Sequence, residues 1–169
     1  MEPATYPSNL TIRPAMPADV PALLALIREL AEYERLLDAV TADEAMLHEA
    51  LFGARPAAEA VLGREGDAIV GFALWFHNFS TFVGRRGLYL EDLYVRPEYR
   101  GRGYGEALLA HLGRVALERG CVRLEWAVLD WNRRAIDFYQ GMGAVPMSEW
   151  TVYRVMGDRL VSLAARARA

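Results

Sequence analysis

Residues 88–105 read LYLEDLYVRPEYRGRGYG, and this stretch decides the fold class of the chain. Its first part, residues 88–95, predicts a strand whose apolar side chains fall on both faces, interrupted only by Glu91 and Asp92. Such a strand is typical of a central position in a sheet that is covered on both sides. Its last part, Arg100 to Gly105, is rich in glycine and stands directly before an amphipathic helix. A strand, a glycine-rich turn and a helix in this order are the placement that an anion-binding cradle requires.

The sequence on both sides of this stretch predicts further strands and helices. The predicted strands are 10–13, 60–63, 69–76, 122–129, 145–147 and 151–156. The predicted helices are one after Asp19 to Glu34, one capped by Thr41 that ends at Gly53, one ending near Gly120, and one after Asn132 to Gly141 or Gly143. A long loop is expected over residues 77–87. The order predicts an α/β fold with a mixed sheet flanked by helices, in one domain over residues 1–169 with tails at 1–9 and 164–169.

Composition and charge restrict the class of protein. The chain has 169 residues, 53% of them hydrophobic, which fits one domain with its own core. Its formal charge is −3 and its pI is near 5.7, which argues against a nucleic-acid partner. All 19 basic residues are arginine. A single cysteine, the lack of a signal-like N-terminus and the shortness of the apolar runs predict a cytoplasmic protein with no membrane partner.

The glycine-rich turn has the form Arg100-x-x-Gly103-x-Gly105. Glycines let an anion approach the backbone N–H groups at the start of a helix, where the helix dipole favours negative charge. The spacing is neither the dinucleotide fingerprint nor a P-loop. The motif therefore predicts a pyrophosphate cradle, and the alternative is an Arg/Gly turn that only starts a helix.

Three segments together resemble a known family. They are Leu88 to Val95, the Arg-Gly turn after it, and Trp131-Asn132-x-x-Ala135-Ile-x-Phe-Tyr139-x-x-x-Gly143-Ala144. In this order they are similar to the GNAT superfamily of N-acetyltransferases, and within it to the diamine acetyltransferases of the spermidine/spermine type. Residues 28–34, RELAEYE, resemble that group's first helix, so the resemblance covers nearly the whole chain. It implies the GNAT fold, a central mixed β-sheet flanked by helices, and a homodimer.

The resemblance also implies a donor and the residues that bind it. Acetyl-CoA would be the co-substrate, and its acetyl group would pass to a primary amine by direct attack in a ternary complex. The strand end would bind pantetheine, the glycine turn the pyrophosphate, and the next helix would add one contact. The residues implied are Leu93, Tyr94, Val95, Arg100, Gly101, Arg102, Gly103, Tyr104, Gly105, Glu106 and Asn132.

Two catalytic residues follow from the same resemblance. Tyr139 matches the position that protonates the departing thiolate, and a phenol with a pKa near ~10 still carries its proton at neutral pH. The alternative is a helix tyrosine that only packs its ring. Glu91 matches a carboxylate that accepts the ammonium proton directly or through water. Asp92 is its neighbour on the strand, and it either binds substrate or makes a structural salt bridge with an arginine.

The acceptor is expected to be a small cationic amine, either a diamine or polyamine or a thialysine-like amino acid. Implied acceptor-binding residues are Tyr33, Glu34, Glu91, Asp92, Glu149 and Trp150. The carboxylate of Glu34 could instead be merely solvated. Two readings of function remain as alternatives: the same chemistry on an amino acid, an antibiotic or a protein N-terminus, and a non-catalytic acyl-CoA-binding module.

No metal site is predicted. His48, His77 and His111 lack the spacing of metal ligands. Cys121 is expected to be a small buried residue rather than a nucleophile, because no adjacent motif supplies a base.

Overall fold

The computed structural model describes residues 7–167. The chain forms two compact units, Met1–Val128 and Leu129–Ala169, which are described separately. The first unit contains β1 (Leu10–Pro14), η1 (Pro17–Asp19), α1 (Val20–Tyr33), η2 (Leu37–Ala39), α2 (Glu44–Phe52), β2 (Glu59–Glu65), β3 (Ala68–Ser80), β4 (Arg85–Val95), η3 (Pro97–Tyr99), α3 (Tyr104–Glu118) and β5 (Leu124–Glu125). The second contains α4 (Arg133–Gly141) and α5 (Asp158–Ala164). One domain over the whole chain stays a prediction.

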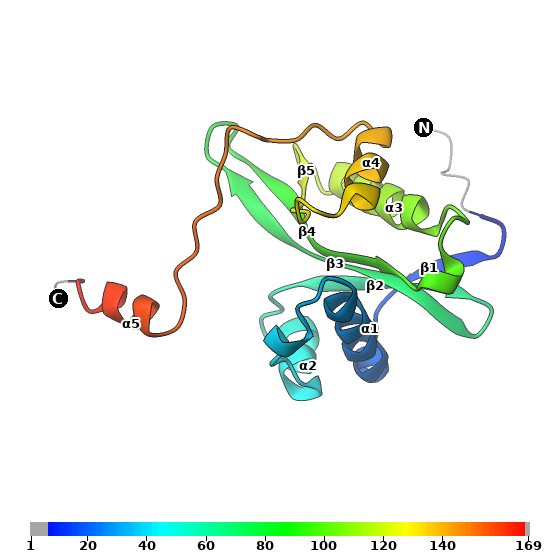
Figure 1. Ribbon diagram of the computed structural model, residues 1–169, viewed down its shortest axis with the longest axis horizontal. Coiled ribbons are helices and arrows are strands. Elements are labelled where there is room, and N and C mark those ends of the chain that lie inside the picture. Colours follow the sequence, from blue (N-terminus) through cyan, green and yellow to red (C-terminus); the bar gives the residue numbers. More distant parts are fainter. Residues whose placement is uncertain (1–6, 168–169) are drawn as a thin grey trace. The chain divides into compact units, whose positions relative to one another are not determined.

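The first unit is built on a five-stranded sheet with the order β1-β2-β3-β4-β5. The first four strands pair antiparallel, whereas β4 and β5 pair in parallel through Leu88 with Leu124 and Tyr89 with Glu125. Helices α1 and α2 lie on one face of this sheet and α3 on the other (Figure 1). The prediction of a mixed sheet flanked by helices is confirmed, and so is the central place of residues 88–95.

The β3–β4 hairpin is longer than the sequence predicted. Residues 77–80 and 85–87, expected to be loop, continue the ladder, which ends where Ser80 pairs with Arg85. Only residues 81–84 form the turn, and Gly84 occupies it with φ +67°. The expectation of a long loop was wrong because this end of the hairpin mixes polar and aromatic residues on exposed faces, which hides the alternation of a strand.

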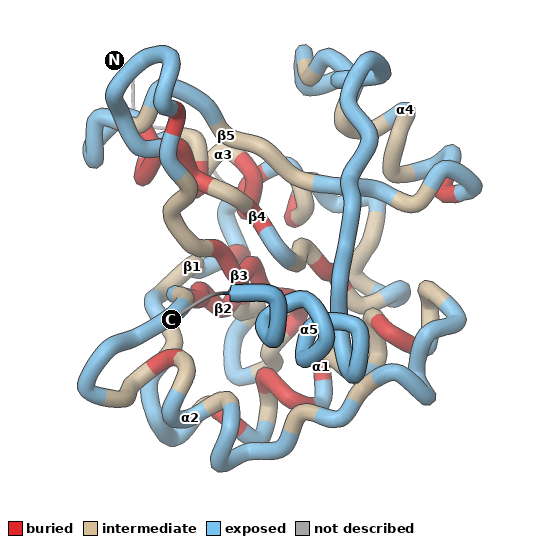
Figure 2. Tube along the Cα trace, turned by 90° about the vertical axis from the view of Figure 1, so that its left-hand side faces the viewer, coloured by how far each residue is buried: buried red, intermediate tan, exposed pale blue. Residues whose placement is uncertain are grey.

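The main core lies between the sheet and the pair α1 and α2. Its residues come from both helices and from the three strands β2, β3 and β4. Figure 2 shows buried residues along these strands and also along α3, on the other face of the sheet. The cluster is Leu23, Leu26, Leu51, Ala60, Leu62, Phe72, Leu74 and Tyr94. The 3–4 spacing of Leu23 and Leu26 puts both on one face of α1, where each is fully buried.

A β-bulge interrupts β4 at Glu91. Leu74 pairs with Asp92 but Trp75 pairs with Leu90, so Glu91 has no partner opposite it. A residue inserted in this way reverses the alternation of the strand. Cross-strand partners share a face, so Asp92 lies on the side of the core residue Leu74, toward α1 and α2.

Two local contacts fix the N-terminal helices. Asp19, expected to cap α1, makes no cap hydrogen bond and instead accepts two bonds from Arg13, at 2.7 and 2.8 Å. Arg13 beside it lowers the pKa of the Asp19 carboxyl by hydrogen bonding. The cap of α2 is Asp43, whose Oδ1 accepts from the N–H of Met46 at 2.8 Å. The prediction of Thr41 was therefore wrong by two residues, because both residue types suit an N-cap.

In the second unit, α4 begins as predicted. The Asn132 side chain caps it by accepting from the N–H of Ala135 at 3.2 Å. The predicted strands 145–147 and 151–156 are wrong, since these residues have no regular structure there. A strand needs a hydrogen-bonded neighbour, which an apolar pattern alone does not supply. Helix α5 was not predicted and begins after Gly157. None of the helices in the described part of the chain is long and apolar enough to cross a membrane.

Candidate active site

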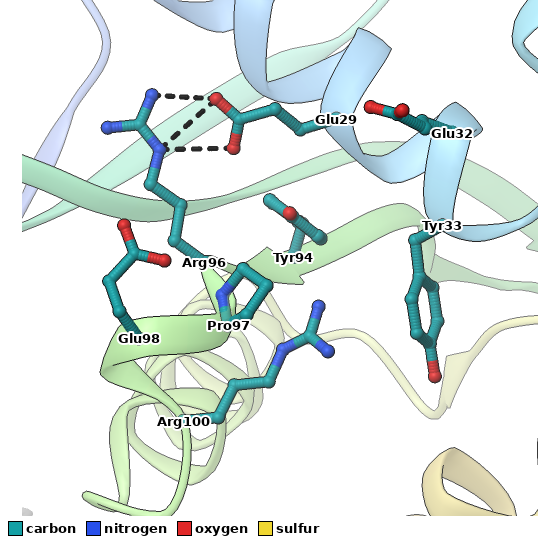
Figure 3. A pocket seen from close by; sticks show the side chains of 8 residues that line it. All are labelled: Glu29, Glu32, Tyr33, Tyr94, Arg96, Pro97, Glu98 and Arg100. Atoms are coloured by element: carbon teal, nitrogen blue, oxygen red, sulfur yellow. Dashed lines mark hydrogen bonds and ion pairs between the residues drawn. The ribbon is translucent and has the colours of Figure 1, made fainter.

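A pocket of about 530 Å³ opens in the first unit where the end of α1 meets the turn after β4. Figure 3 shows side chains from both elements converging on it. Its lining is Glu29, Glu32, Tyr33, Tyr94, Arg96, Pro97, Glu98 and Arg100. Three of these residues were predicted site residues, Tyr33 for the acceptor and Tyr94 and Arg100 for the donor.

An ion pair fastens the end of α1 to the end of β4. Arg96 donates from Nε and Nη2 to the carboxylate of Glu29, at 3.0 and 2.8 Å (Figure 3). Its Nη1 donates to the carbonyl of Ile69 at 2.9 Å. This two-pronged geometry is the strong form of an arginine–carboxylate contact. Sequence reasoning missed both partners, because 67 residues separate them and neither lies in a motif.

Arg100 lies between the two tyrosines of the pocket. Its guanidinium carbon is 4.8 Å from the ring centroid of Tyr33 and 5.4 Å from that of Tyr94. Its Nε donates to the carbonyl of Val95 at 2.8 Å. Both distances to the rings are within the range of cation–π contacts.

The turn that follows Arg100 has the geometry of an anion cradle. Gly101 and Gly103 have φ of +76° and +80°, in the left-handed region that favours glycine. A Cβ at Gly101 would meet no atom within 4 Å, so space is open above the turn. The backbone N–H groups of Tyr104, Gly105 and Glu106 belong to the first turn of α3, where no carbonyl of the helix can accept from them. These donors sit at the N-terminus of α3 and fit a pyrophosphate.

The second arginine of the turn is already engaged. Arg102 forms an ion pair with Glu65 at 3.1 Å and donates to the carbonyl of Glu98 at 3.1 Å. Its guanidinium also lies 5.2 Å from the ring centroid of Tyr99. The two arginines expected to serve the anionic donor therefore differ in their surroundings.

The three predicted acceptor-side carboxylates of this unit interact electrostatically. Asp92 is half-buried, and burial raises its pKa to about 6, with further contributions from the charges of Glu91 and Glu34. Burial also raises the pKa of Glu34. Glu91, predicted to accept the ammonium proton, is the exposed residue of the bulge. A carboxyl with a pKa near neutrality is well suited to gain and lose a proton, and here that carboxyl is Asp92.

The remaining predicted residues belong to the second unit. Tyr139 is half-buried in α4, with its ring centroid 5.2 Å from that of Phe138, and Asn132 caps the same helix. Glu149 and Trp150 are exposed in the segment after α4. The structure thus brings together the acceptor residues of the first unit with the strand end and the turn. The roles of the four second-unit residues stay predictions.

Cys121 is half-buried rather than buried. Its Sγ lies 3.9 Å from Nδ1 of His77, a neighbour that the sequence could not show because 44 residues separate the two. Among the described residues, no group of three or more His, Cys, Asp or Glu side chains is placed to hold a metal ion.

Known proteins are similar to this chain in sequence and in fold. The chain is 40% identical to thialysine N-epsilon-acetyltransferase of Bos taurus, over 92% of this chain and 97% of that protein. It is 32% identical to L-ornithine N5-acetyltransferase of Arabidopsis thaliana, over 90% of this chain and 86% of that protein. An integron cassette protein from V. cholerae shares the fold with a TM-score of 0.78 and 28% identity, over 92% and 98% of the two chains.

The family profile described as "Acetyltransferase (GNAT) family" matches residues 23–144, which include the α1 segment, the bulged strand, the cradle and α4. The chain belongs to this family and is an acetyl-CoA-dependent N-acetyltransferase.

Proposed function

We propose that the protein transfers the acetyl group of acetyl-CoA to a primary amine of a small cationic acceptor, by direct attack in a ternary complex. The observation that carries the acceptor class is the half-buried Asp92, with the charges of Glu34 and Glu91 acting on it. Three carboxylates near one another attract an ammonium group, which relieves their mutual repulsion. The relatives named for thialysine and L-ornithine acetylation support an acceptor that carries an amino group on a short side chain.

The chain's own residues account for the donor site. The N–H groups of residues 101–106 and the guanidinium of Arg100 would hold the pyrophosphate, and the backbone of residues 93–95 would bind the pantetheine arm. Acetyl-CoA supplies the acetyl group as an activated thioester. Asn132 would add a contact from α4.

Two proton transfers are assigned: a carboxylate takes a proton from the acceptor ammonium, and a phenol gives a proton to the departing thiolate. An alkylammonium has a pKa near ~10.4 and must lose a proton before it can attack. Oδ of Asp92 or Oε of Glu91 accepts that proton, directly or through water. The Tyr139 hydroxyl donates its proton to the departing thiolate, whose conjugate acid has a pKa near ~8.5 by analogy with cysteine.

An amine panel tests the proposal. The purified protein is incubated with acetyl-CoA and thialysine, ornithine, spermidine, lysine or an aminoglycoside, and thiol release is followed. We expect turnover to be fastest with the small amino acids or diamines. Fastest turnover with an aminoglycoside or with a peptide N-terminus would replace the acceptor class, and tight CoA binding without turnover on any amine would favour a non-catalytic module.

Variants separate the catalytic roles. We expect Tyr139→Phe to lower kcat by one to three orders of magnitude without weakening CoA binding, since only the donated proton is lost. Asp92→Asn should remove the acidic limb of the kcat/KM profile, and Glu91→Gln should shift it to lower pH, because one charge that raises the pKa of Asp92 is gone. If Glu91→Gln removes the limb and Asp92→Asn keeps it, Glu91 is the base.

We also propose a homodimer in a cytoplasmic setting. The end of β3 and the turn after it expose Phe79, Phe82 and Val83, with Phe82 96% exposed. The segment after α4 exposes further large apolar side chains: Val145, Met147, Trp150, Val152, Tyr153, Val155 and Met156. Apolar surface of this extent is typical of an interface. Light scattering should give twice the chain mass of 18.9 kDa, and a clean monomer at micromolar concentration would remove this proposal.

A further inference from the structure

We propose that Tyr33 serves the donor side of the reaction as a positioning residue, by holding the Arg100 guanidinium with its ring so that the arginine can bind the pyrophosphate. The inference rests on the proposed function, because it concerns the same donor. It changes the role of Tyr33, whose sequence context had placed it with the acceptor.

Three contacts fix the orientation of Arg100. The ring of Tyr33 lies 4.8 Å from its guanidinium carbon, the ring of Tyr94 lies 5.4 Å away, and Nε donates to the carbonyl of Val95 at 2.8 Å. Figure 3 shows the side chain extending from the turn toward both rings. Within residues 7–167, no acceptor is bonded to its two terminal amino groups. The arginine is therefore held by two aromatic rings and by its Nε, while its outer N–H donors remain available.

This is the arrangement that phosphate recognition needs from an arginine. Stacking on aromatic rings occupies the faces of the guanidinium plane, whereas phosphate oxygens bind to its N–H edge in that plane. A side chain that is already ordered loses less rotamer entropy when the ligand binds. Arg100 directly precedes Gly101, the first open residue of the cradle.

Charge near the pocket supports the same assignment. Glu29 is neutralised by Arg96 at 2.8 Å. Glu32 and Glu98 are exposed pocket residues, and neither forms an ion pair with Arg100 within residues 7–167. Arg100 thus keeps its positive charge for an anionic ligand, and the ring of Tyr33 contributes position rather than charge.

Tyr99 provides a matched control on the same turn. Its ring lies 5.2 Å from the guanidinium of Arg102, which resembles the contact of Tyr33 with Arg100. Arg102, however, is held independently by Glu65 and by the carbonyl of Glu98. Removing the Tyr99 ring should therefore leave its arginine in place.

Titration calorimetry with CoA tests the inference without turnover. We expect Tyr33→Leu to bind CoA about three- to tenfold more weakly than wild type, the range of one cation–π contact. Tyr33→Phe keeps the ring and should bind within about twofold of wild type, as should Tyr99→Leu. If Tyr33→Leu does not fold, Tyr33→Met, which fills similar volume without a π face, takes its place.

A double-mutant cycle decides whether Tyr33 acts through Arg100. In an Arg100→Ala background, Tyr33→Leu should not weaken CoA binding further. Equal losses in both backgrounds, or an unchanged CoA affinity with a raised KM for the amine, would overturn the inference and return Tyr33 to the acceptor. Failure of the wild-type protein to bind CoA would instead overturn the proposed function.

Discussion

Neutralising Asp92 should stabilise the protein at neutral pH while it damages acceptor use. The carboxyl has a pKa of about 6 in the folded chain and near ~3.9 in an unfolded one. This difference corresponds to about 3 kcal/mol of unfavourable ionisation. Because the side chain is only half-buried and water screens its neighbours, about half of that value is a realistic expectation, about 1.5 kcal/mol.

The sign depends on pH in a defined way. As pH falls below the unfolded-state pKa of ~3.9, Asp92 becomes protonated in both states and no longer lowers the free energy of unfolding. As pH rises from 4 through 6 the unfolded state ionises first, so the wild-type protein loses stability, and the loss is complete near pH 7. Asparagine resembles the protonated acid at every pH. Asp92→Asn should therefore match the wild type near pH 4 and exceed it at pH 7.5.

Calorimetric melting at the two pH values measures the effect. For a chain of this length, 1.5 kcal/mol corresponds to a rise in Tm of about 3–6 °C. The control Asp38→Asn neutralises an exposed carboxylate in η2 and should change Tm by less than about 1 °C at either pH. Equal gains for Asp92→Asn at pH 4 and pH 7.5, or no gain at pH 7.5, would refute the reasoning. If Asp92→Asn keeps the wild-type KM for the amine acceptor, only the predicted role of Asp92 in acceptor use would be refuted.

Three further changes have defined outcomes. Gly103→Ala forces a side chain into a φ of +80° and should raise the acetyl-CoA KM severalfold, whereas Gly113→Ala in α3, with open space around it, should not. Leu26→Ala empties a fully buried site and should lower the urea unfolding free energy by about 2–5 kcal/mol, against less than about 0.5 for the exposed Leu117→Ala. Asp19→Asn should lower Tm more at pH 7 than at pH 3, because the lowered pKa of Asp19 contributes stability that is complete above its unfolded-state pKa and is lost as pH falls through the folded-state pKa.

The sequence predicts well where a repeating pattern and a boundary residue agree. The leucines of α1 recur with helical spacing after two prolines, and Asn132 stands at the start of α4, so both helices begin where they were expected. The glycines at 101 and 103 predict the cradle, because a turn with positive φ accepts few residue types other than glycine. Each of these features is decided within a few residues of chain.

Features that depend on distant partners could not be predicted. The contact of Arg96 with Glu29 requires α1 to be placed against β4. The bulge can be located only when the pairing of β4 with β3 is known. Without that pairing, regular alternation puts the two adjacent acids on opposite faces and gives no reason to prefer either one. The structure separates them into an exposed Glu91 and a half-buried Asp92. That distinction makes Asp92 a second candidate for the proton acceptor beside Glu91.

The bulge also makes the length of β4 matter as much as its composition. The alternation of side chains reverses at residue 91. Odd-numbered residues before the bulge and even-numbered residues after it therefore face the same helix layer. Deleting Glu91 would leave Leu90 opposite Trp75 and Asp92 opposite Leu74, so the strand would become regular and both halves would keep their layers. A residue inserted elsewhere in 88–95 would instead turn the side chains on one side of it to the wrong layer, so conservative substitutions should be tolerated better than such an insertion. The exposed turn at 81–84, by contrast, should accept changes in length.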